Sequence, residues 1–432
     1  MQNPFHNWLL MVEERIPRES GFSWLPFESR RLKGQPKKAG MVCFLGLGTS
    51  MYAFLHVAHR SVILWTLSAV STRNSMDQPV AVRVYDFFVG CGGASCGFQA
   101  SGMDIAFALD RDADAKKTFT ANFPNAHFEF TDIYKVDCEA VRFRVEREQP
   151  NPVLFSGCAP CQPFSRQVTR RPKPEQDERV PLLTRFADLV ECCRPDLVFV
   201  ENVPGLQTLD VGSQPFSGFL NRLEKAGYEM DHGPVKLMKY GIPQSRRRLV
   251  LVASRHGKIS LPDETHGPGT PHEQYSTVRD WIAHLPPIQA GEEHKEIPNH
   301  RAANLSARNL ERIAATREGR SNRDWPQHLI LECHKDFSGY SDVYGRMSWD
   351  APASGLTTKC TSYSNGRFGH PEQNRAISIR EAACLQTFPM DFVFEGNMAS
   401  MARQIGNAVP VRFAELIGQQ FIKHLKEVRR LN

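Results

Sequence analysis

The feature that most constrains this chain is a short apolar run that leads into a cysteine set between two prolines. The run from Val153 to Phe155 predicts a buried strand, and the loop after it contains Pro160, Cys161 and Pro163. Proline fixes its own φ angle and restricts the residue before it, so this loop is stiff. Open α/β sheets place reactive groups in loops at the carboxyl ends of parallel strands. We therefore interpret Cys161 as a candidate nucleophile.

Two other interpretations of this loop stay open at this point. Cys158 and Cys161 form a Cys-x-x-Cys pair, which could be a redox pair or half of a zinc site. A zinc site needs a second close pair of Cys or His, and the adjacent Cys192 and Cys193 lack the usual spacing. A redox pair should open a helix, which Pro163 and the polar residues after it do not favour. No convincing ligand spacing occurs elsewhere, so no metal is expected.

Composition indicates the broad class of protein. The chain has 432 residues, of which 41% are hydrophobic, and a net charge of +6. This length suggests two or three domains, and the hydrophobic content predicts a sizeable core in a soluble globular protein. The mild positive charge suits a polyanionic partner. Eleven cysteines in so long a chain do not indicate a disulfide scaffold, and we interpret them as reduced thiols of a cytosolic protein.

The first 75 residues differ in character from the rest. Their apolar stretch, from Met41 to Val70, is interrupted by His56, His59 and Arg60. A membrane helix would avoid such charges, so a transmembrane span is disfavoured. We expect a poorly structured extension here, and Met76 could be the true start of translation.

Acidic residues accompany three successive strand-like runs. Val82 to Phe88 contains Asp86 and leads into a glycine loop, Ile105 to Leu109 ends at Asp110, and His127 to Phe130 is followed by Asp132. Glycines between a strand and a helix let the backbone approach a ligand, although many such loops are only turns. An acid after the second strand commonly binds ribose hydroxyls, and the alternative is a helix cap. We expect Asp110 to bind a ligand and Asp112 to cap the next helix, and the three acids suggest a cofactor with hydroxyl and amine groups.

A further acid and a run of arginines follow. The apolar strand from Asp196 to Val200 ends in Glu201, which is costly to bury unless it is paired or functional. It would face the same edge as Cys161. Residues 246–248 are three arginines that lead into a strand from Leu249 to Ala253, so some of them should point along the sheet edge.

The remaining chain suggests an insertion and a return. Proline, glycine and histidine become more frequent after Arg255, and one helix is predicted from Ala302 to Glu318. The last helix has an amphipathic pattern that should pack on the sheet. The predicted organisation is an N-terminal extension at 1–75, a sheet-forming domain at 76–255, an inserted second domain at 256–343, and a return to the first domain at 344–432; the resemblance described next implies that the first is the catalytic and cofactor-binding domain and the second a target-recognition domain.

Six short motifs from Val82 onward resemble, in order, those of the DNA (cytosine-5) methyltransferase family, in its bacterial restriction-modification type. Each motif is weak alone, but six in the family order are specific. One departure is Asp110-Arg111, where the family often has a glutamate followed by a tryptophan. The motifs are Asp86 to Gly93, Pro160-Cys161-Gln162, Glu201-Asn202-Val203, Gln244 to Arg248, Arg380 to Pro389, and Gly406 to Val409.

The resemblance implies an α/β fold with a Rossmann-like, S-adenosylmethionine-dependent methyltransferase sheet, helices on both faces, and a small variable target-recognition domain. It implies methyl transfer from S-adenosylmethionine to C5 of a flipped-out cytosine in a specific double-stranded DNA sequence, through a covalent Cys161 adduct at C6. The implied catalytic residues are Cys161, Glu201, Arg246 and Arg248. The implied cofactor-binding residues are Asp86, Phe88, Gly90, Gly92, Gly93, Asp110, Asp132, Ile133, Pro160, Asn407 and Val409, and the implied substrate-binding residues are Gln162, Ser165, Asn202 and Gln244.

Rival functions and implied partners follow from the same motifs. The tRNA-directed branch of the family shares two motifs but usually carries a Cys-Phe-Thr tripeptide, which is absent here, so DNA is favoured. A non-catalytic nucleic-acid-binding relative is disfavoured because every catalytic position is intact. A nicotinamide-dependent dehydrogenase is disfavoured because the glycine spacing differs from that of dinucleotide-binding loops. The implied setting is a cytoplasmic, nucleoid-associated monomer without membrane contact, with a cognate restriction endonuclease acting separately.

Overall fold

The computed structural model describes residues 81–160, 180–204, 215–332 and 342–431, together with three strands before them. The chain divides into two compact units, Met1–Gln78 and Pro79–Asn432. This division falls close to the boundary expected at residue 75. Among the described residues, no helix is both long and apolar enough to cross a membrane.

The first unit contains a small antiparallel sheet, where a poorly structured extension had been expected. Its strands are β1 (Val42–Leu47), β2 (Ser50–Leu55) and β3 (Ile63–Trp65), in that order across the sheet. For residues 1–75 as a whole, the expected extension stays a prediction. These segments are rich in aromatic and aliphatic residues, which favour strands.

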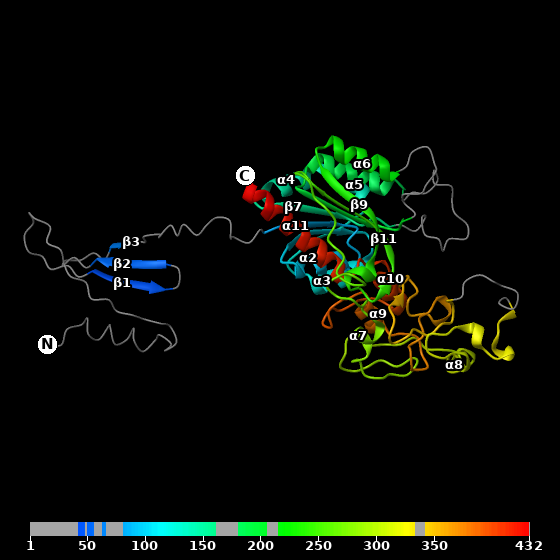
Figure 1. The fold of residues 1–432 in the computed structure, drawn as a ribbon. Helices are drawn as coiled ribbons and strands as arrows, with labels where there is room; N and C mark the ends of the chain where they lie inside the picture. The colour runs from blue at the N-terminus through cyan, green and yellow to red at the C-terminus, as the bar shows by residue number, and fades with distance from the viewer. Residues whose placement is uncertain are drawn as a thin grey trace, which may run out of the picture. The chain divides into compact units, whose positions relative to one another are not determined.

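The second unit is built around one seven-stranded sheet (Figure 1). Strands β4 to β8 run parallel to one another, and β11 runs antiparallel to both β8 and β9. The order is β6-β5-β4-β7-β8-β11-β9, so the chain reverses its direction of travel across the sheet between β4 and β7. Ligands bind outside the carboxyl ends of the strands at such a switch point. The strands are β4 (Arg83–Phe87), β5 (Asp104–Asp110), β6 (His127–Phe130), β7 (Val153–Gly157), β8 (Leu197–Asn202), β9 (Glu229–Lys236) and β11 (Arg247–Ser254).

Helices cover both faces of this sheet (Figure 1). One face is covered by α2 (Gly93–Ala100), α3 (Ala113–Asn122) and α11 (Val411–Leu431), whose apolar side chains join one core cluster. The other face is covered by α4 (Cys138–Arg147), α5 (Val180–Cys193) and α6 (Pro215–Lys225), which share a second cluster. Every residue of β7 and β8 is buried, as expected for central parallel strands with two covered faces. The predicted Rossmann-like sheet with helices on both faces is confirmed.

The elements outside the seven-stranded sheet and its covering helices are short, and part of this chain forms a smaller core of its own. A third core cluster there combines Ile313, Trp325 and Leu329 with Tyr363 and Ala376, so its side chains come from both sides of the boundary expected at residue 343. The elements are α7 (Val278–Ile282), α8 (Ala307–Ala314), α9 (Ile379–Leu385), α10 (Met398–Asn407), the short strands β10 (Gln244–Ser245) and β12 (Ala353–Ser354), and the 3₁₀ helices η2 (Ile133–Lys135), η6 (Leu237–Tyr240), η7 (Asn322–Asp324), η8 (Gln327–Leu329) and η10 (Tyr363–Asn365).

The helix predicted from Ala302 to Glu318 is shorter in the structure, where it spans Ala307–Ala314. Ser306 caps its first turn, because the Ser306 side chain accepts a hydrogen bond from the Asn309 backbone N–H. The buried Ala302 instead donates its N–H to the Glu292 carbonyl outside the helix.

Candidate active site

The glycine loop between β4 and α2 is shaped by left-handed backbone conformations. Phe88, Gly90 and Gly92 have φ angles of 60°, 55° and 91°. The Gly90 N–H donates to Asp110 Oδ2 at 2.8 Å, which fastens the loop to the end of β5. A Cβ atom added at Gly90 would meet nothing within 4 Å, so the loop borders open space that a ligand can occupy.

Gly93 joins this loop to the last predicted motif, more than 300 residues away in the chain. A Cβ atom at Gly93 would lie 2.5 Å from the Val409 carbonyl oxygen, so only glycine allows this approach. Val409 is buried, while Asn407, at the end of α10, is exposed. The structure thus brings the predicted cofactor residues Gly93, Asn407 and Val409 into one region.

The three predicted acids have different surroundings. Asp86 is only 1% exposed, and Ser95 Oγ donates to its carboxylate at 2.6 Å. Burial raises the pKa of Asp86 to about 6. Ser95 was not identified from the sequence, although a serine in the first turn after a glycine loop is the available signal. Asp86 therefore ties α2 to β4 from inside the fold.

Asp110 and Asp132 lie at the carboxyl edge of the sheet. The carboxylate of Asp110 accepts N–H bonds from Gly90 and Asp112, and burial raises its pKa. Asp112 caps α3, as predicted, with its side chain accepting from the N–H groups of residues 114 and 115. Asp132 accepts a hydrogen bond from the Tyr134 N–H and pairs with Arg111 at 2.7 Å. Burial alone would raise the pKa of Asp132, but these two contacts outweigh that effect and lower it. The predicted Ile133 is buried in the next turn.

These residues fit a nucleoside-bearing cofactor. The loop offers open space at Gly90, and Phe88, half-buried beside it, offers an aromatic face. The carboxylates of Asp110 and Asp132 keep lone pairs that can accept hydroxyl or amine hydrogens. This donor and acceptor set matches S-adenosylmethionine in kind.

Glu201 lies at the end of β8 and is paired with Arg248 near the start of β11. The distance from Arg248 Nε to Glu201 Oε1 is 2.7 Å, and the two side chains are 16% and 8% exposed. Leu249 pairs with Asn202 across the two strands. Arg248 and Glu201, the residues just before them, therefore both lie at the carboxyl edge of β8. A buried carboxylate is stable only when paired, and Arg248 supplies that partner.

The loop after β7 begins beside Glu201. Asn202 Nδ2 donates to the Ala159 carbonyl at 3.1 Å, so this side chain holds the loop against β8. Pro160 is exposed. Burial, with the negative charge of Glu201 and Asp86, raises the pKa of the Cys158 thiol well above its usual range, so Cys158 is a protonated neighbour. The predicted residues Cys161, Gln162 and Ser165 lie outside the described residues.

The other residues of the arginine motif contact the protein interior. Arg246 is 5% exposed and donates to the carbonyl oxygens of Leu356 and Gly406. Gln244 is fully buried: its side chain donates to the Leu385 carbonyl and to Gln386, and accepts from the Leu356 N–H. The resemblance implies a catalytic role for Arg246 and substrate binding for Gln244; in the structure the contacts of both side chains hold three distant segments together.

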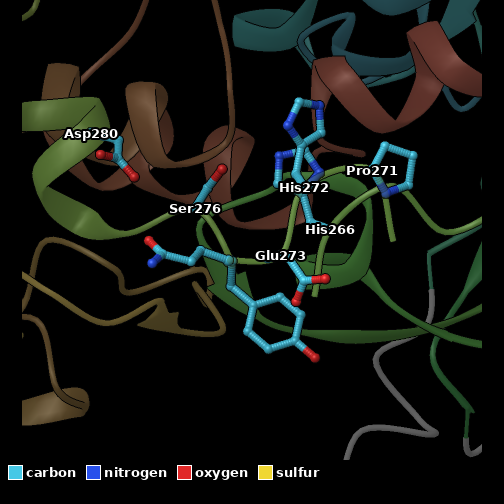
Figure 2. Close-up of a pocket in the computed structure, with 8 residues that line it drawn as sticks. His266, Pro271, His272, Glu273, Ser276 and Asp280 are labelled. Atoms are coloured by element: carbon cyan, nitrogen blue, oxygen red, sulfur yellow. The ribbon is translucent and has the colours of Figure 1, made fainter. Parts of the chain in front are cut away.

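An open hollow of about 510 Å³ lies in the segment expected to recognise the target (Figure 2). The His266 and His272 rings are 4.5 Å apart there. Burial, together with His272 and Arg412, lowers the pKa of His266. None of the strand-end residues described above lines it. The lining residues are His266, Pro271, His272, Glu273, Gln274, Tyr275, Ser276 and Asp280.

The sheet order, the glycine loop and the acids at one edge define a Rossmann-like fold of the S-adenosylmethionine-dependent methyltransferase class. Residues 82–423 match the family model described as C-5 cytosine-specific DNA methylase, and the chain belongs to that family. It is a DNA (cytosine-5) methyltransferase.

Individual relatives agree with this assignment. The Type II methylase M.HgiDII of Herpetosiphon aurantiacus is 41% identical over 357 residues, which cover 81% of this chain and 98% of that protein. The Type II methyltransferase M.PspPI of a Psychrobacter species is 31% identical over 348 residues, 79% of each chain. A solved DNA modification methyltransferase from an Escherichia coli prophage has a TM-score of 0.62 and 24% identity, covering 80% of this chain and 99% of that one. The last likeness shows the shared fold.

Proposed function

We propose that this enzyme transfers a methyl group from S-adenosylmethionine to C5 of a flipped-out cytosine in a specific double-stranded DNA sequence. Cys161 forms the transient covalent adduct at C6. The observation that carries the proposal is the buried Glu201–Arg248 pair, at the carboxyl edge of β8 and beside the start of the Pro160-Cys161-Gln162 segment. A carboxyl group and a thiol at one sheet edge are the two groups that activation of a cytosine ring requires.

Cytosine C5 is a poor nucleophile in the free base. Addition of the Cys161 thiolate at C6 gives an enamine, in which C5 is a good nucleophile, and one difficult step becomes two easier ones. Glu201 hydrogen-bonds to N3 and to the amino group of the ring and shares a proton there, which offsets the negative charge that develops during attack. Loss of the C5 proton and of Cys161 then restores the aromatic ring.

Arg248 has two tasks in this proposal. Its guanidinium orients the Glu201 carboxylate through the 2.7 Å contact, and its remaining N–H groups lie near where the base edge and the neighbouring phosphate enter. Arg246, Gln244 and Asn202 act indirectly, since each holds backbone on which the site depends.

S-Adenosylmethionine supplies an electrophilic methyl group when bound. We assign its binding to Phe88 and to the open space beside Gly90, with Asp110 and Asp132 accepting hydrogen bonds from it. Asp86, Gly92, Gly93, Ile133, Pro160, Asn407 and Val409 shape the same edge.

The target base must leave the helical stack, at a cost of a few kcal/mol. The loop that contains Gln162 and Ser165, and the segment 256–343, are the parts of the chain that we assign to compensating DNA contacts. Relatives named Type II methylases support a role as the modification enzyme of a restriction-modification pair, whose endonuclease acts separately. We further propose a monomer that acts in the cytoplasm, bound to the nucleoid through DNA.

The test is incubation of the purified protein with labelled S-adenosylmethionine and unmethylated genomic DNA, in parallel with tRNA. Nucleoside mass spectrometry identifies the product, and bisulfite sequencing locates it. We expect 5-methyldeoxycytidine at one recurring sequence. Label in tRNA alone would assign the enzyme to RNA, and label in neither nucleic acid would contradict the proposal.

A further inference from the structure

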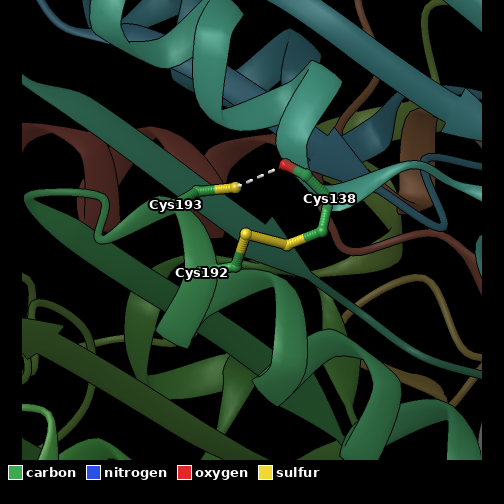
Figure 3. Close-up of side chains that lie close together, drawn as sticks. All are labelled: Cys138, Cys192 and Cys193. Atoms are coloured by element: carbon green, nitrogen blue, oxygen red, sulfur yellow. Dashed lines mark hydrogen bonds between the residues drawn. A yellow bond between two sulfur atoms is a disulfide. The ribbon is translucent and has the colours of Figure 1, made fainter.

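Three cysteines from two helices meet on the face of the sheet covered by α4 and α5 (Figure 3). Cys138 is the first residue of α4, and Cys192 and Cys193 are the last two residues of α5. Their sulfur atoms all lie within 4.8 Å of one another, and Cys138 and Cys192 form a disulfide. Spacing along the sequence did not reveal this cluster, because 54 residues separate Cys138 from Cys192.

A fourth group completes the set. Glu139 Oε1 lies 3.8 Å from Cys192 Sγ. A tetrahedral zinc ion has Zn–S distances of about 2.3 Å and Zn–O distances of about 2.0–2.2 Å, so its ligand atoms stand roughly 3.5–3.8 Å from one another. The three sulfur atoms, all within 4.8 Å of one another, are close enough to share one ion, and the Glu139 oxygen stands at a matching distance from Cys192 Sγ.

The ends of the helices favour such an ion. The carboxyl end of α5 is the negative end of that helix's dipole, which favours a cation, and the amino end of α4 stabilises negative charge on Cys138. Cys193 is buried, so the cluster is partly shielded from water.

We propose that Cys138, Cys192, Cys193 and Glu139 form a structural site for a thiophilic divalent cation such as Zn²⁺ in the reduced protein. The site is separate from the methyl-transfer chemistry and requires nothing from it. The Cys138–Cys192 disulfide is the oxidised form of the same cluster. Its reduction by a phosphine adds two electrons and two protons to give two thiols, while the phosphine takes up oxygen from water.

The position of the site suggests what it stabilises. Arg185, on α5, donates to the carbonyl oxygens of Ile133 and Val136, in the turn that precedes α4. Asp132 and Ile133, at the start of that turn, belong to the proposed cofactor edge. A cation that joins α4 to α5 would therefore fix this edge.

The experiment is a Co²⁺ titration of the full chain, reduced with a phosphine, followed by optical spectroscopy. We expect one Co²⁺ per chain, with thiolate-to-cobalt charge-transfer bands and the intense visible bands of a tetrahedral ion, and displacement by Zn²⁺. The decisive variant is Cys193→Ser, because it leaves the Cys138–Cys192 pair able to form its disulfide. We expect it to weaken Co²⁺ binding at least about tenfold. The control is Cys96→Ser, on α2, which should bind as the unaltered chain does.

The outcomes are distinct from those of the methylation assay. Saturable binding that depends on Cys193 supports the site whether or not methylation is observed. Absence of tetrahedral Co²⁺ bands in the reduced chain overturns the proposal. Equal binding by Cys193→Ser and the unaltered chain also overturns it, because the ion would then be held elsewhere.

Discussion

Glu201 and Arg248 form a largely buried ion pair at the proposed site, 2.7 Å apart. Replacing Glu201 with glutamine keeps the shape but removes the group that shares a proton with the base. We expect kcat to fall by about 10²- to 10⁴-fold, the usual contribution of acid–base catalysis. Single-turnover methylation of a DNA duplex measures this. Glu224→Gln, which removes an exposed acid on α6, should leave the rate unchanged.

Arg248 should affect the same step as Glu201, in which a proton is shared with the cytosine ring. Arg248→Met leaves Glu201 without its ion-pair partner, so part of the Glu201 effect should already be lost in that variant. The double variant is then expected to be less impaired than two independent effects would predict, because the residues act as a unit. Full additivity of the two substitutions would refute the coupling of Arg248 to Glu201.

Cys161→Ala tests the nucleophile directly. Without a thiolate to add at C6, C5 stays a poor nucleophile, and we expect no detectable methylation. Binding of S-adenosylmethionine, measured by calorimetry, and the thermal unfolding midpoint should be retained, since the groups proposed to bond to the cofactor lie at the ends of β4, β5 and β6. Turnover by this variant at the normal rate would rule out Cys161 as the nucleophile.

At the scale of elements, α2 and α11 pack so closely that one glycine becomes essential. A Cβ atom at Gly97, on α2, would lie 2.3 Å from the Val411 carbonyl oxygen and 2.5 Å from the Ala414 side chain. We expect Gly97→Ala to lower the free energy of unfolding by about 1–3 kcal/mol, as overpacking does. Urea unfolding measures the change.

The matched control is Gly218→Ala, on α6. A Cβ atom there would meet nothing within 4 Å, and the residue is exposed. Alanine should raise stability by about 0.5–1 kcal/mol, because glycine loses more backbone freedom on folding. If both variants changed stability in the same direction, close packing of α2 on α11 would not be the reason.

Elements also show how far the sequence determines the site. Apolar runs and capping residues are local signals in the sequence. They made it possible to predict the ends of two strands, at Asp110 and Glu201, and the helix cap at Asp112. The internal roles of Gln244 and Arg246 were not, since their partners lie more than 100 residues away in the chain. The same limit applies to Ser95 and Asp86, whose contact depends on how α2 packs. The disulfide was missed because composition says nothing about which cysteines meet.

At the scale of the whole molecule, two buried groups give stability opposite dependences on pH. His370 is 2% exposed, and its Nδ1 accepts N–H bonds from residues 372 and 373, which leaves no room for a proton there. Burial, reinforced by nearby arginines, lowers its pKa to about 4. Unfolded histidine takes up a proton near pH 6.5. The contribution of neutral His370 to the free energy of unfolding is therefore complete above pH 6.5 and is lost as the pH falls towards 4.

Asp86 acts in the other direction. Its folded pKa of about 6 lies above the unfolded value of 3.8. The contribution of Asp86 to the free energy of unfolding is therefore complete below pH 3.8 and is lost as the pH rises through 6. Each group accounts for about 3 kcal/mol across its window. Between pH 4 and pH 6 the two effects nearly cancel.

Single substitutions should separate the two effects. We expect His370→Asn to make the free energy of unfolding fall as the pH rises from 4 to 6, and Asp86→Asn to make it rise, each by about 3 kcal/mol relative to the unaltered chain. Urea unfolding at several pH values measures both slopes. His284→Asn, at an exposed histidine, is the control and should leave the slope unchanged. The pKa shifts of His300 and Asp110 are common to all the variants and cancel in these differences. Parallel curves for the three variants would mean that neither His370 nor Asp86 sets the pH dependence, and that these groups keep their ordinary protonation inside the fold.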